Sequence, residues 1–270
     1  MAVTTMSFAG FSSTGSSRSM SGFKFFELLD FLVIAGGGAG GGGNGWGGGG
    51  GGAGGYRCSI TGENTGGGLS AERKFVVSKG QVLSLIIGAG GANSSSGSAG
   101  HGFDSTLGPI VAFGGGKSRR FDGDPQHVGG SGAGGMELFQ TAGIGVVGQG
   151  YAGSGGKDRG GGGAGSAGSG GTPGAGVSSS ITGSAVTRAV GGPGNSAGSN
   201  GAANTGTAGG GNRNTGSIGQ GGSGLIVFVL PLKVLVTFSA GVTQSNSVVG
   251  GKRVYVVTAT STSSETVTIG

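Results

Sequence analysis

Two glycine patterns in this 270-residue chain have spacings used by phosphate-binding proteins. Gly36-x-Gly38-x-x-Gly41 follows an apolar run, as does the turn that cradles a dinucleotide pyrophosphate. That turn must open a helix, and the sequence over 41–55 is too rich in glycine to form one. The pattern therefore predicts no dinucleotide site.

The second pattern, Gly116-Lys117-Ser118, matches the end of a phosphate-binding loop. That loop also requires glycine five positions before the second one, and Val111 stands there. The pattern therefore does not predict a nucleotide phosphate site.

Residues that could hold a metal or perform acid–base chemistry are scarce. His101 and His127 are the only histidines, and neither lies in an HExxH pattern or beside the single Cys58. Asp122 and Asp124 precede Pro125 and read as a solvated turn. The ten Asp and Glu residues include no pair with a spacing typical of catalysis. We therefore expect no enzyme, no metal site and no cofactor.

The charge is modest and scattered. Sixteen Lys and Arg against ten Asp and Glu give a formal net charge of +6. Nucleic-acid-binding proteins concentrate such charge in a stripe or tail. RNA-binding RGG segments repeat, and this chain has one, at Arg159-Gly160-Gly161. No specific nucleic-acid partner is expected.

Non-glycine insertions between glycine runs are the remaining candidates for a binding site. They combine cationic, aromatic and apolar side chains, and Trp, Tyr and Arg dominate binding hot spots. The alternative is that they are solvated loops, with Trp46 and Phe139 covering the rest of the fold. Cationic side chains would suit phosphate or carboxylate groups on a surface glycan. The candidate contact residues are Trp46, Lys117, Arg119, Arg120, Phe121, Met136, Phe139, Tyr151, Lys157, Arg159 and Arg213.

The elements that must position these side chains fall into three zones. Residues 35–224 hold 69 of the 76 glycines, and only 27 of their 190 residues are Leu, Ile, Val or Phe. That zone cannot bury a conventional core. Residues 1–30 are rich in Ser, Thr and Phe, and residues 225–270 are rich in β-branched residues. The zones predict an N-terminal attachment segment over 1–30, a glycine-rich domain over 31–230 and a C-terminal β segment over 231–270.

Strands are expected at the apolar and β-branched runs bounded by turn residues. Lys79-Gly80 suits a hairpin turn between two of these runs. A helix could form at most near residues 23–29, because glycine is unfavourable in helices. The expected strands are 31–34, 74–77, 82–87, 110–113, 225–229, 234–238, 252–260 and 266–269.

Three states compete at this glycine density. Disorder is one of them, because glycine loses more backbone freedom on folding than any other residue. The glycine zone is bracketed by the apolar runs 31–34 and 225–227 and has β-forming runs within it, which favours a packed lattice over disorder. Collagen is excluded, since glycine does not recur at every third position and prolines number five. In a bundle of polyglycine-II helices, extended chains with three residues per turn pack closely and hydrogen-bond to one another. The candidate runs for such helices are 47–52, 160–165 and 209–211.

Glycine-rich and apolar motifs follow one another along the chain at 31–38, 50–57, 85–91, 104–108, 113–116, 148–150, 160–165 and 221–227. The order of these motifs resembles the glycine-rich domain of bacteriophage tail-fibre and adhesin proteins, which bind host receptors. The similarity covers about residues 31–230. The resemblance implies a mostly β and irregular fold with almost no α-helix, in which a small β scaffold carries a bundle of polyglycine-II helices.

The resemblance also implies a function. Loops between glycine runs would meet a bacterial surface receptor, either a glycan or an outer-membrane protein, and the terminal segments would bind other virion proteins. The protein would be a virion component of the tail fibre or tail tip, made in the host cytoplasm, since residues 1–22 lack the pattern of a secretory signal. The alternative is a purely structural virion component, such as a capsid decoration or tail connector. Monomer and homo-oligomer both remain open.

Overall fold

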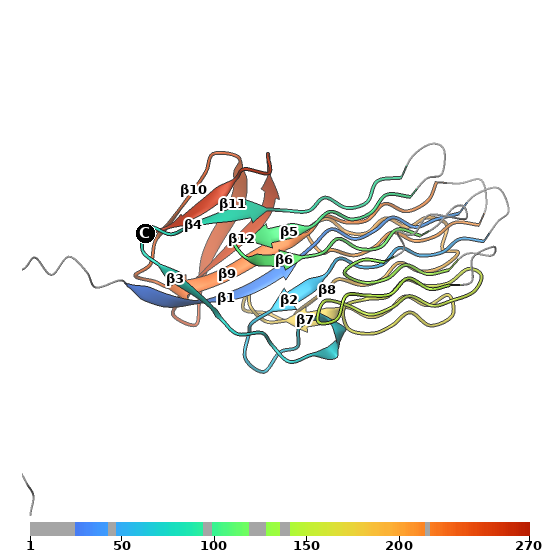
Figure 1. The fold of residues 1–270 in the computed structure, drawn as a ribbon, viewed down its shortest axis with the longest axis horizontal. Coiled ribbons are helices and arrows are strands. Elements are labelled where there is room, and N and C mark those ends of the chain that lie inside the picture. The colour runs from blue at the N-terminus through green and yellow to red at the C-terminus, as the bar shows by residue number, and fades with distance from the viewer. Residues whose placement is uncertain (1–24, 43–46, 94–98, 119–127, 136–140, 214–216) are drawn as a thin grey trace, which may run out of the picture.

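The computed structural model describes residues 25–42, 47–93, 99–118, 128–135, 141–213 and 217–270. β-Strands gather at one end, and long undulating runs extend from them side by side (Figure 1). Within the described residues there are thirteen strands, and the single helical element is the 3-10 turn η1 (Gly66–Gly68). The fold is therefore mostly β with almost no α-helix, as the sequence predicted.

The first sheet has β1 (Phe26–Ile34) and β9 (Leu225–Pro231) at its centre, paired antiparallel from Asp30–Val229 to Ile34–Leu225. Two short strands share the other side of β1, and they pair with its two halves. Beyond β9 lies a long C-terminal hairpin. These outer strands are β2 (Tyr56–Cys58), β3 (Phe75–Ser78), β11 (Val242–Val249) and β12 (Lys252–Thr260).

The second sheet is antiparallel throughout and has the order β10-β13-β4-β5-β6. A separate hairpin is formed by β7 and β8. The strands of these two units are β4 (Val82–Ile86), β5 (Ser105–Leu107), β6 (Ile110–Ala112), β7 (Val177–Ser179), β8 (Val186–Arg188), β10 (Val236–Phe238) and β13 (Thr266–Ile269).

From Leu29 onward β1 is buried on both faces, as β9 is from Leu225 to Leu230, which explains the nearly continuous apolar sequences there. Side chains alternate between the two faces of a strand. Phe31 and Phe228 therefore face the core between the two sheets, where Leu85 and Tyr255 also lie. Phe228 stacks on Tyr255 with ring centroids 5.0 Å apart. This interface is the main apolar core.

The opposite face of β1 and β9 carries a second apolar cluster. Leu32 and Val227 lie there with Tyr56 of β2. Ala53 and Ala164 of the glycine zone complete the cluster, and both are fully buried. The glycine zone thus packs directly on the scaffold through the few positions that carry a methyl group.

Backbone hydrogen bonds in the glycine zone follow a three-residue period. The N–H groups of Gly36 and Ala39 donate to Phe103 and Gly100 of one neighbouring run. Gly37 and Gly40 donate to Gly222 and Gly219 of a second run, and Gly38 and Gly41 donate to Gly52 and Gly49 of a third. Successive residues therefore point to three different neighbours in turn, as a helix with three residues per turn requires.

The run over 50–55 has the same period but mixes chain directions. Gly50 and Ala53 donate to Arg159 and Gly162, so that neighbour runs parallel. The run over 206–209 is antiparallel, since Gly51 and Gly54 donate to Gly209 and Gly206. We call the set of hydrogen-bonded runs over 35–42, 48–55, 88–92, 100–103, 113–118, 129–135, 160–165, 189–194, 206–212 and 219–224 the glycine lattice. The period identifies its runs as polyglycine-II helices.

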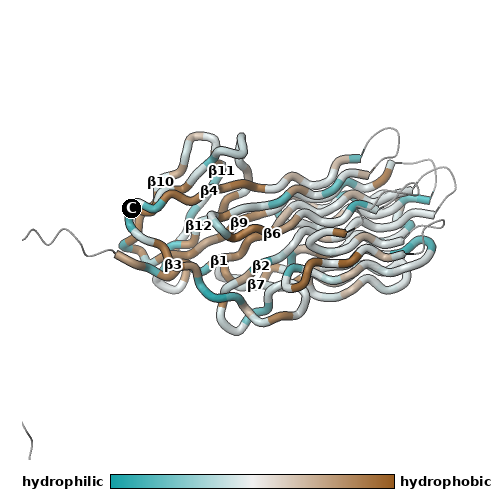
Figure 2. The backbone as a smooth tube through the Cα atoms, viewed as in Figure 1, coloured by the Kyte–Doolittle hydropathy of each residue, from teal (hydrophilic) through white to brown (hydrophobic). Residues whose placement is uncertain are grey.

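Close backbone approach explains the composition of the lattice. A Cβ atom built on Gly52 would lie 2.1 Å from the Ser131 carbonyl oxygen, and one on Gly36 would lie 1.9 Å from that of Ala89. No side chain fits at those distances. Figure 2 accordingly shows strongly apolar residues concentrated in the sheets, with few in the runs.

Two expectations about local structure are wrong. Lys79-Gly80 does not close a hairpin, because β3 pairs with β1 and β4 pairs with β13 and β5. The turn instead carries the chain from one sheet to the other. Residues 26–29 form part of β1 and not a helix, since their backbone groups pair with β3.

The C-terminal residues supply strands to both sheets. β12 pairs with β9, and β13 pairs with β4. The Lys252 ammonium also lies 3.4 Å from the buried Asp30 carboxylate, which Lys74 approaches to 3.0 Å. Residues 231–270 therefore share their core with the scaffold, and the domain boundary at 230 stays a prediction. Within the described part of the chain, no helix is long and apolar enough to span a membrane.

Glu265 fastens the loop after β10 to the start of β13. Its carboxylate accepts hydrogen bonds from the Ser239, Ser261 and Thr262 hydroxyls and from the Gly241 N–H. These hydrogen bonds favour the charged form and hold the pKa of Glu265 below its ordinary value, led by that from Ser239.

We predict that Gly52→Ala destabilises the fold by about 1–3 kcal/mol, as overpacking does. The added methyl group would meet the Ser131 carbonyl at 2.1 Å. Gly171→Ala is the matched control, because its nearest neighbour is 3.3 Å away. Urea unfolding measures both, and equal stability of the two variants would contradict the close packing of the lattice.

We also predict that the Glu265→Gln variant loses less stability in acid than the wild type does. Since the folded pKa of Glu265 is lowered, its contribution is present above pH 4.5 and is lost as the pH falls through the folded value. The free energy of unfolding of the wild type should therefore drop more between pH 5 and pH 3 than that of the variant. If the free energy of unfolding of both proteins falls equally over this pH range, the charged form of Glu265 does not stabilise the fold.

Candidate functional site

The candidate contact residues divide into two groups. Lys117, Tyr151, Lys157, Arg159 and Arg213 belong to the described part of the chain. The others lie outside the described residues, and their contact role stays a prediction. They are Trp46, Arg119, Arg120, Phe121, Met136 and Phe139.

The glycine lattice has an end remote from the sheets. The run that leaves β1 at Ala35 reaches Gly42 seven residues later, about 22 Å away at 3.1 Å per residue. Gly42 forms a parallel bridge with Asn212. Runs with this register end together, as Figure 1 shows on the side opposite the strands. We call this end the lattice tip and define it by Gly42, Gly48, Asp158, Asn212 and Arg213.

Asp158 joins three segments at the lattice tip. One carboxylate oxygen accepts a hydrogen bond of 2.6 Å from the Gly48 N–H, and the other lies 2.9 Å from Arg213 Nη2. Asp158 has φ of 55°, a left-handed conformation that Asp and Asn tolerate better than most residues. The Asp158 side chain is 18% exposed and that of Arg213 is 41% exposed. The pair therefore orients a guanidinium that water still reaches.

Arg159 follows Asp158 in the same turn. Its carbonyl accepts the Gly50 N–H, and its own N–H donates to Gly135. Its guanidinium folds back over the turn, so that a Cβ on Gly156 would lie 2.8 Å from Arg159 Nε. Lys157, Arg159 and Arg213 are all partly exposed. The structure thus brings three of the predicted cations to one turn: Lys157 and Arg159 flank Asp158 in the chain, and Arg213 pairs with it.

Lys117 lies on a neighbouring run of the lattice. The next residue, Ser118, is buried, and its N–H donates to the Ala39 carbonyl. Its hydroxyl donates to the Gly134 carbonyl. Because Ala39 precedes Gly42 by three residues, Lys117 lies within about 10 Å of the tip along the helix axis. Lys117 is itself half-buried.

Tyr151 lies apart from the tip. A Cβ on Gly68 of η1 would lie 2.2 Å from the Tyr151 hydroxyl, so the ring rests on η1 beside the scaffold. The adjacent Gln149 carbonyl accepts the N–H of Tyr56 in β2. The structure therefore places Tyr151 at the scaffold end and does not group it with the tip cations.

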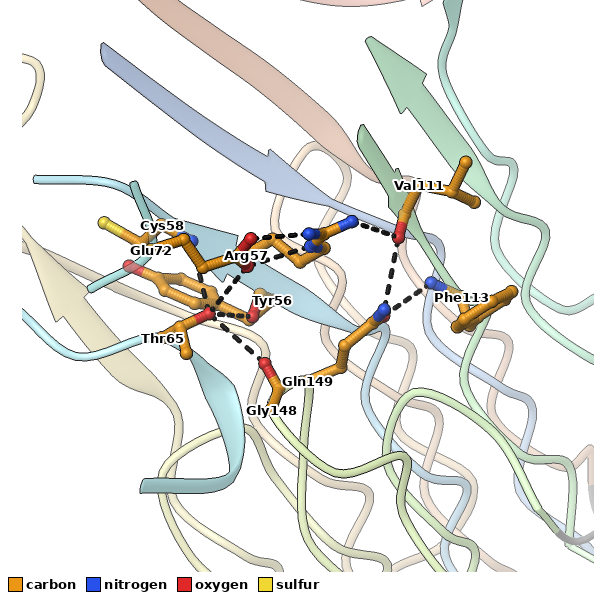
Figure 3. A network of polar contacts seen from close by, with 9 residues as sticks. All are labelled: Tyr56, Arg57, Cys58, Thr65, Glu72, Val111, Phe113, Gly148 and Gln149. Carbon is orange, nitrogen blue, oxygen red and sulfur yellow. Dashed lines mark hydrogen bonds and ion pairs between the residues drawn. The ribbon is translucent and has the colours of Figure 1, made fainter. Parts of the chain in front are cut away.

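Figure 3 shows a polar network around β2 that sequence reasoning missed. Arg57 donates through Nε to Glu72 at 2.8 Å and through Nη1 to the Val111 carbonyl at 3.2 Å. Gln149 donates to the same carbonyl and accepts the Phe113 N–H. The network ties β2 and β6 to the first turn of the lattice. The one feature of the sequence that could have indicated this network is Gln149, a polar residue between two glycines.

Burial holds the one thiol of this region in its neutral form. Burial raises the pKa of Cys58 to about 12, with the nearby Glu63 carboxylate adding to the shift. Burial likewise raises the pKa of the adjacent Tyr56. A neutral thiol is a poor nucleophile and a poor metal ligand. These side chains pack the scaffold.

We predict that Asp158→Ala destabilises the fold by about 1–3 kcal/mol, because the Gly48 N–H loses its acceptor. Asp158→Asn keeps an acceptor and suits the positive φ. The Asn variant should lower the free energy of unfolding by less than about 1 kcal/mol, since a partly exposed ion pair contributes little. Denaturant unfolding of the two variants checks this, and equal losses would show that the ion pair, not the backbone acceptor, stabilises the tip.

Comparison with known proteins agrees with the lattice. A family profile described as glycine-rich domain matches residues 19–230. Searches among curated proteins and among solved structures found no match. The matched region includes β1, β9 up to Leu230 and all runs of the lattice. Because the match covers more than half of the sequence, the chain belongs to the glycine-rich domain family.

Proposed function

We propose that this protein is a bacteriophage virion component of the tail fibre or tail tip that helps the particle attach to its host. The observation that carries the proposal is the separation of two ends: a β scaffold at one end and a rigid lattice with a cationic tip at the other. Recognition residues in proteins favour loops held on a rigid scaffold. The resemblance of its motif series to that of tail-fibre proteins supports the same assignment.

The chemistry of the tip favours an anionic receptor group. Arg213 is oriented by Asp158 at 2.9 Å and retains 41% exposure. Guanidinium groups bind phosphate and carboxylate through two parallel hydrogen bonds. Phosphate or carboxylate groups of a surface glycan, or acidic side chains of an outer-membrane protein, meet this requirement. Neither binding mode requires a cofactor.

The rival proposal is a structural virion component without receptor contact. It is favoured by apolar side chains that the scaffold leaves exposed: Phe26 at 61%, Leu28 at 56% and Val76 at 51%. The register places these three on one face of β1 and β3, because Leu28 lies opposite Val76. Such a patch fits a neighbouring virion protein. Gold-labelled particles viewed by electron microscopy separate the proposals, since a buried tip excludes receptor contact.

We predict that removing the side chains of candidate contact residues weakens binding to host cells. One variant replaces Lys117 and residues 119–122 with Ser and Gly and keeps the buried Ser118, and a second replaces residues 136–139. Binding of the labelled protein should fall at least about tenfold in one of them, since one hot-spot side chain contributes about 2 kcal/mol.

The matched control changes charge at the scaffold end. Arg73 and Lys79 are both exposed there, and the Arg73→Ser/Lys79→Ser variant should bind as the wild type does. Far-ultraviolet circular dichroism of each variant confirms that the fold is retained. Unchanged binding of both contact-residue variants overturns the proposed receptor contact.

A further inference from the structure

We propose that two copies of this protein join through β11 and continue the first sheet across a two-fold axis. β11 is the outermost strand of that sheet, and among the described residues only β12 pairs with it. Its six central residues, 243–248, are exposed on both faces. Its outer N–H and C=O groups therefore form an open edge of eight residues.

The open edge lacks the features that usually prevent strand addition. Natural edges are short, charged or interrupted by proline. The opposite edge of this sheet consists of the short β2 and β3, with Arg57 in one and Lys74 next to the other. The edges of the second sheet, β10 and β6, have three residues each. β11 alone among these is long, and it contains no charged residue and no proline.

The bulge in this hairpin leaves the open edge regular. The register between β11 and β12 shifts between Thr243 and Gln244. The extra residue is Thr258 of β12, whose hydroxyl donates to the Thr243 carbonyl. The unpaired residue thus lies on the inner strand, so the outer backbone groups of β11 keep a continuous strand geometry.

Two-fold symmetry restricts how two such edges can meet. A two-fold axis that relates antiparallel neighbours stands perpendicular to the sheet, and it keeps each residue on its own face. Directly opposite residues also share a face. The strand must therefore pair about one of its own residues and not about a peptide bond between two.

Pairing about Ser245 gives the best match. It sets Val242 opposite Val248, Thr243 opposite Ser247 and Gln244 opposite Asn246 of the second copy. Val242 already packs on the main core, whereas Val248 is 58% exposed. Pairing about Asn246 instead sets Val248 against Gln244. The Ser245 register buries valine on valine and brings no charges together, which is the pattern of a self-complementary interface.

Disulfide trapping tests this register with the full-length chain. In the proposed pair the two Ser245 side chains are direct neighbours, with Cβ atoms about 5 Å apart. Ser245→Cys should therefore cross-link on oxidation into a covalent dimer. Ser247→Cys is the matched control, because its two copies would lie four residues apart along the strands, about 13 Å. The wild-type protein, which contains only the buried Cys58, is the control for cross-linking through that thiol.

Sedimentation velocity provides the second readout. The wild type should dimerise at micromolar concentrations, and Ser245→Lys should raise the dissociation constant at least tenfold by opposing two ammonium groups. Ser263→Lys, on an exposed turn elsewhere, should dimerise as the wild type does. A monomeric wild type, an unaffected Ser245→Lys dimer, or cross-linking of Ser247→Cys equal to that of Ser245→Cys overturns the proposal.

Discussion

Hydrogen bonds between the backbones of neighbouring glycine runs are the interaction on which this structure depends. A polyglycine-II helix satisfies none of its own N–H and C=O groups. Each run must therefore be surrounded by others, as Gly36, Gly37 and Gly38 show by donating to three different runs. A single run would expose unpaired backbone, so the lattice can form only as a whole. The sheets supply the apolar burial that brings the runs together.

Because the runs lie so close together, glycine and the other residues occupy different positions in the fold. A Cβ on most lattice glycines would lie about 2 Å from a neighbouring carbonyl, so those positions exclude side chains. Ala53 and Ala164 occur where the lattice meets the scaffold, and their methyl groups join the second apolar cluster. Charged side chains such as Arg213 are confined to the ends of runs. A lattice of this kind therefore carries its chemistry at its tip and its attachment surfaces on the scaffold.

Much of the scaffold could be predicted from sequence. The apolar runs that became β9 and β13 are bounded by turn residues, and the β-branched run that became β12 has matching limits. β11 was missed because its centre, Thr-Gln-Ser-Asn-Ser, is neither apolar nor alternating, as expected for a strand exposed on both faces. The hairpin at Lys79-Gly80 was wrong because a turn sequence specifies a reversal and not which sheet receives the next strand. The Arg57–Glu72 pair joins residues 15 apart, a spacing that no local pattern reports.

The sequence by itself determined that the chain would have little α-helix, that its core would come from a few β islands, and that glycine would be packed and not merely flexible. Those conclusions follow from composition and local pattern, because glycine opposes helices and β-branched residues favour strands. Only the tertiary structure decided which runs are neighbours, which are parallel, and that Asp158 meets Gly48 and Arg213 while Tyr151 lies at the other end. The physical reason is that glycine carries no side chain to specify a partner. The order of the runs is therefore set by the strands that hold their ends and by the backbone groups that every run must satisfy.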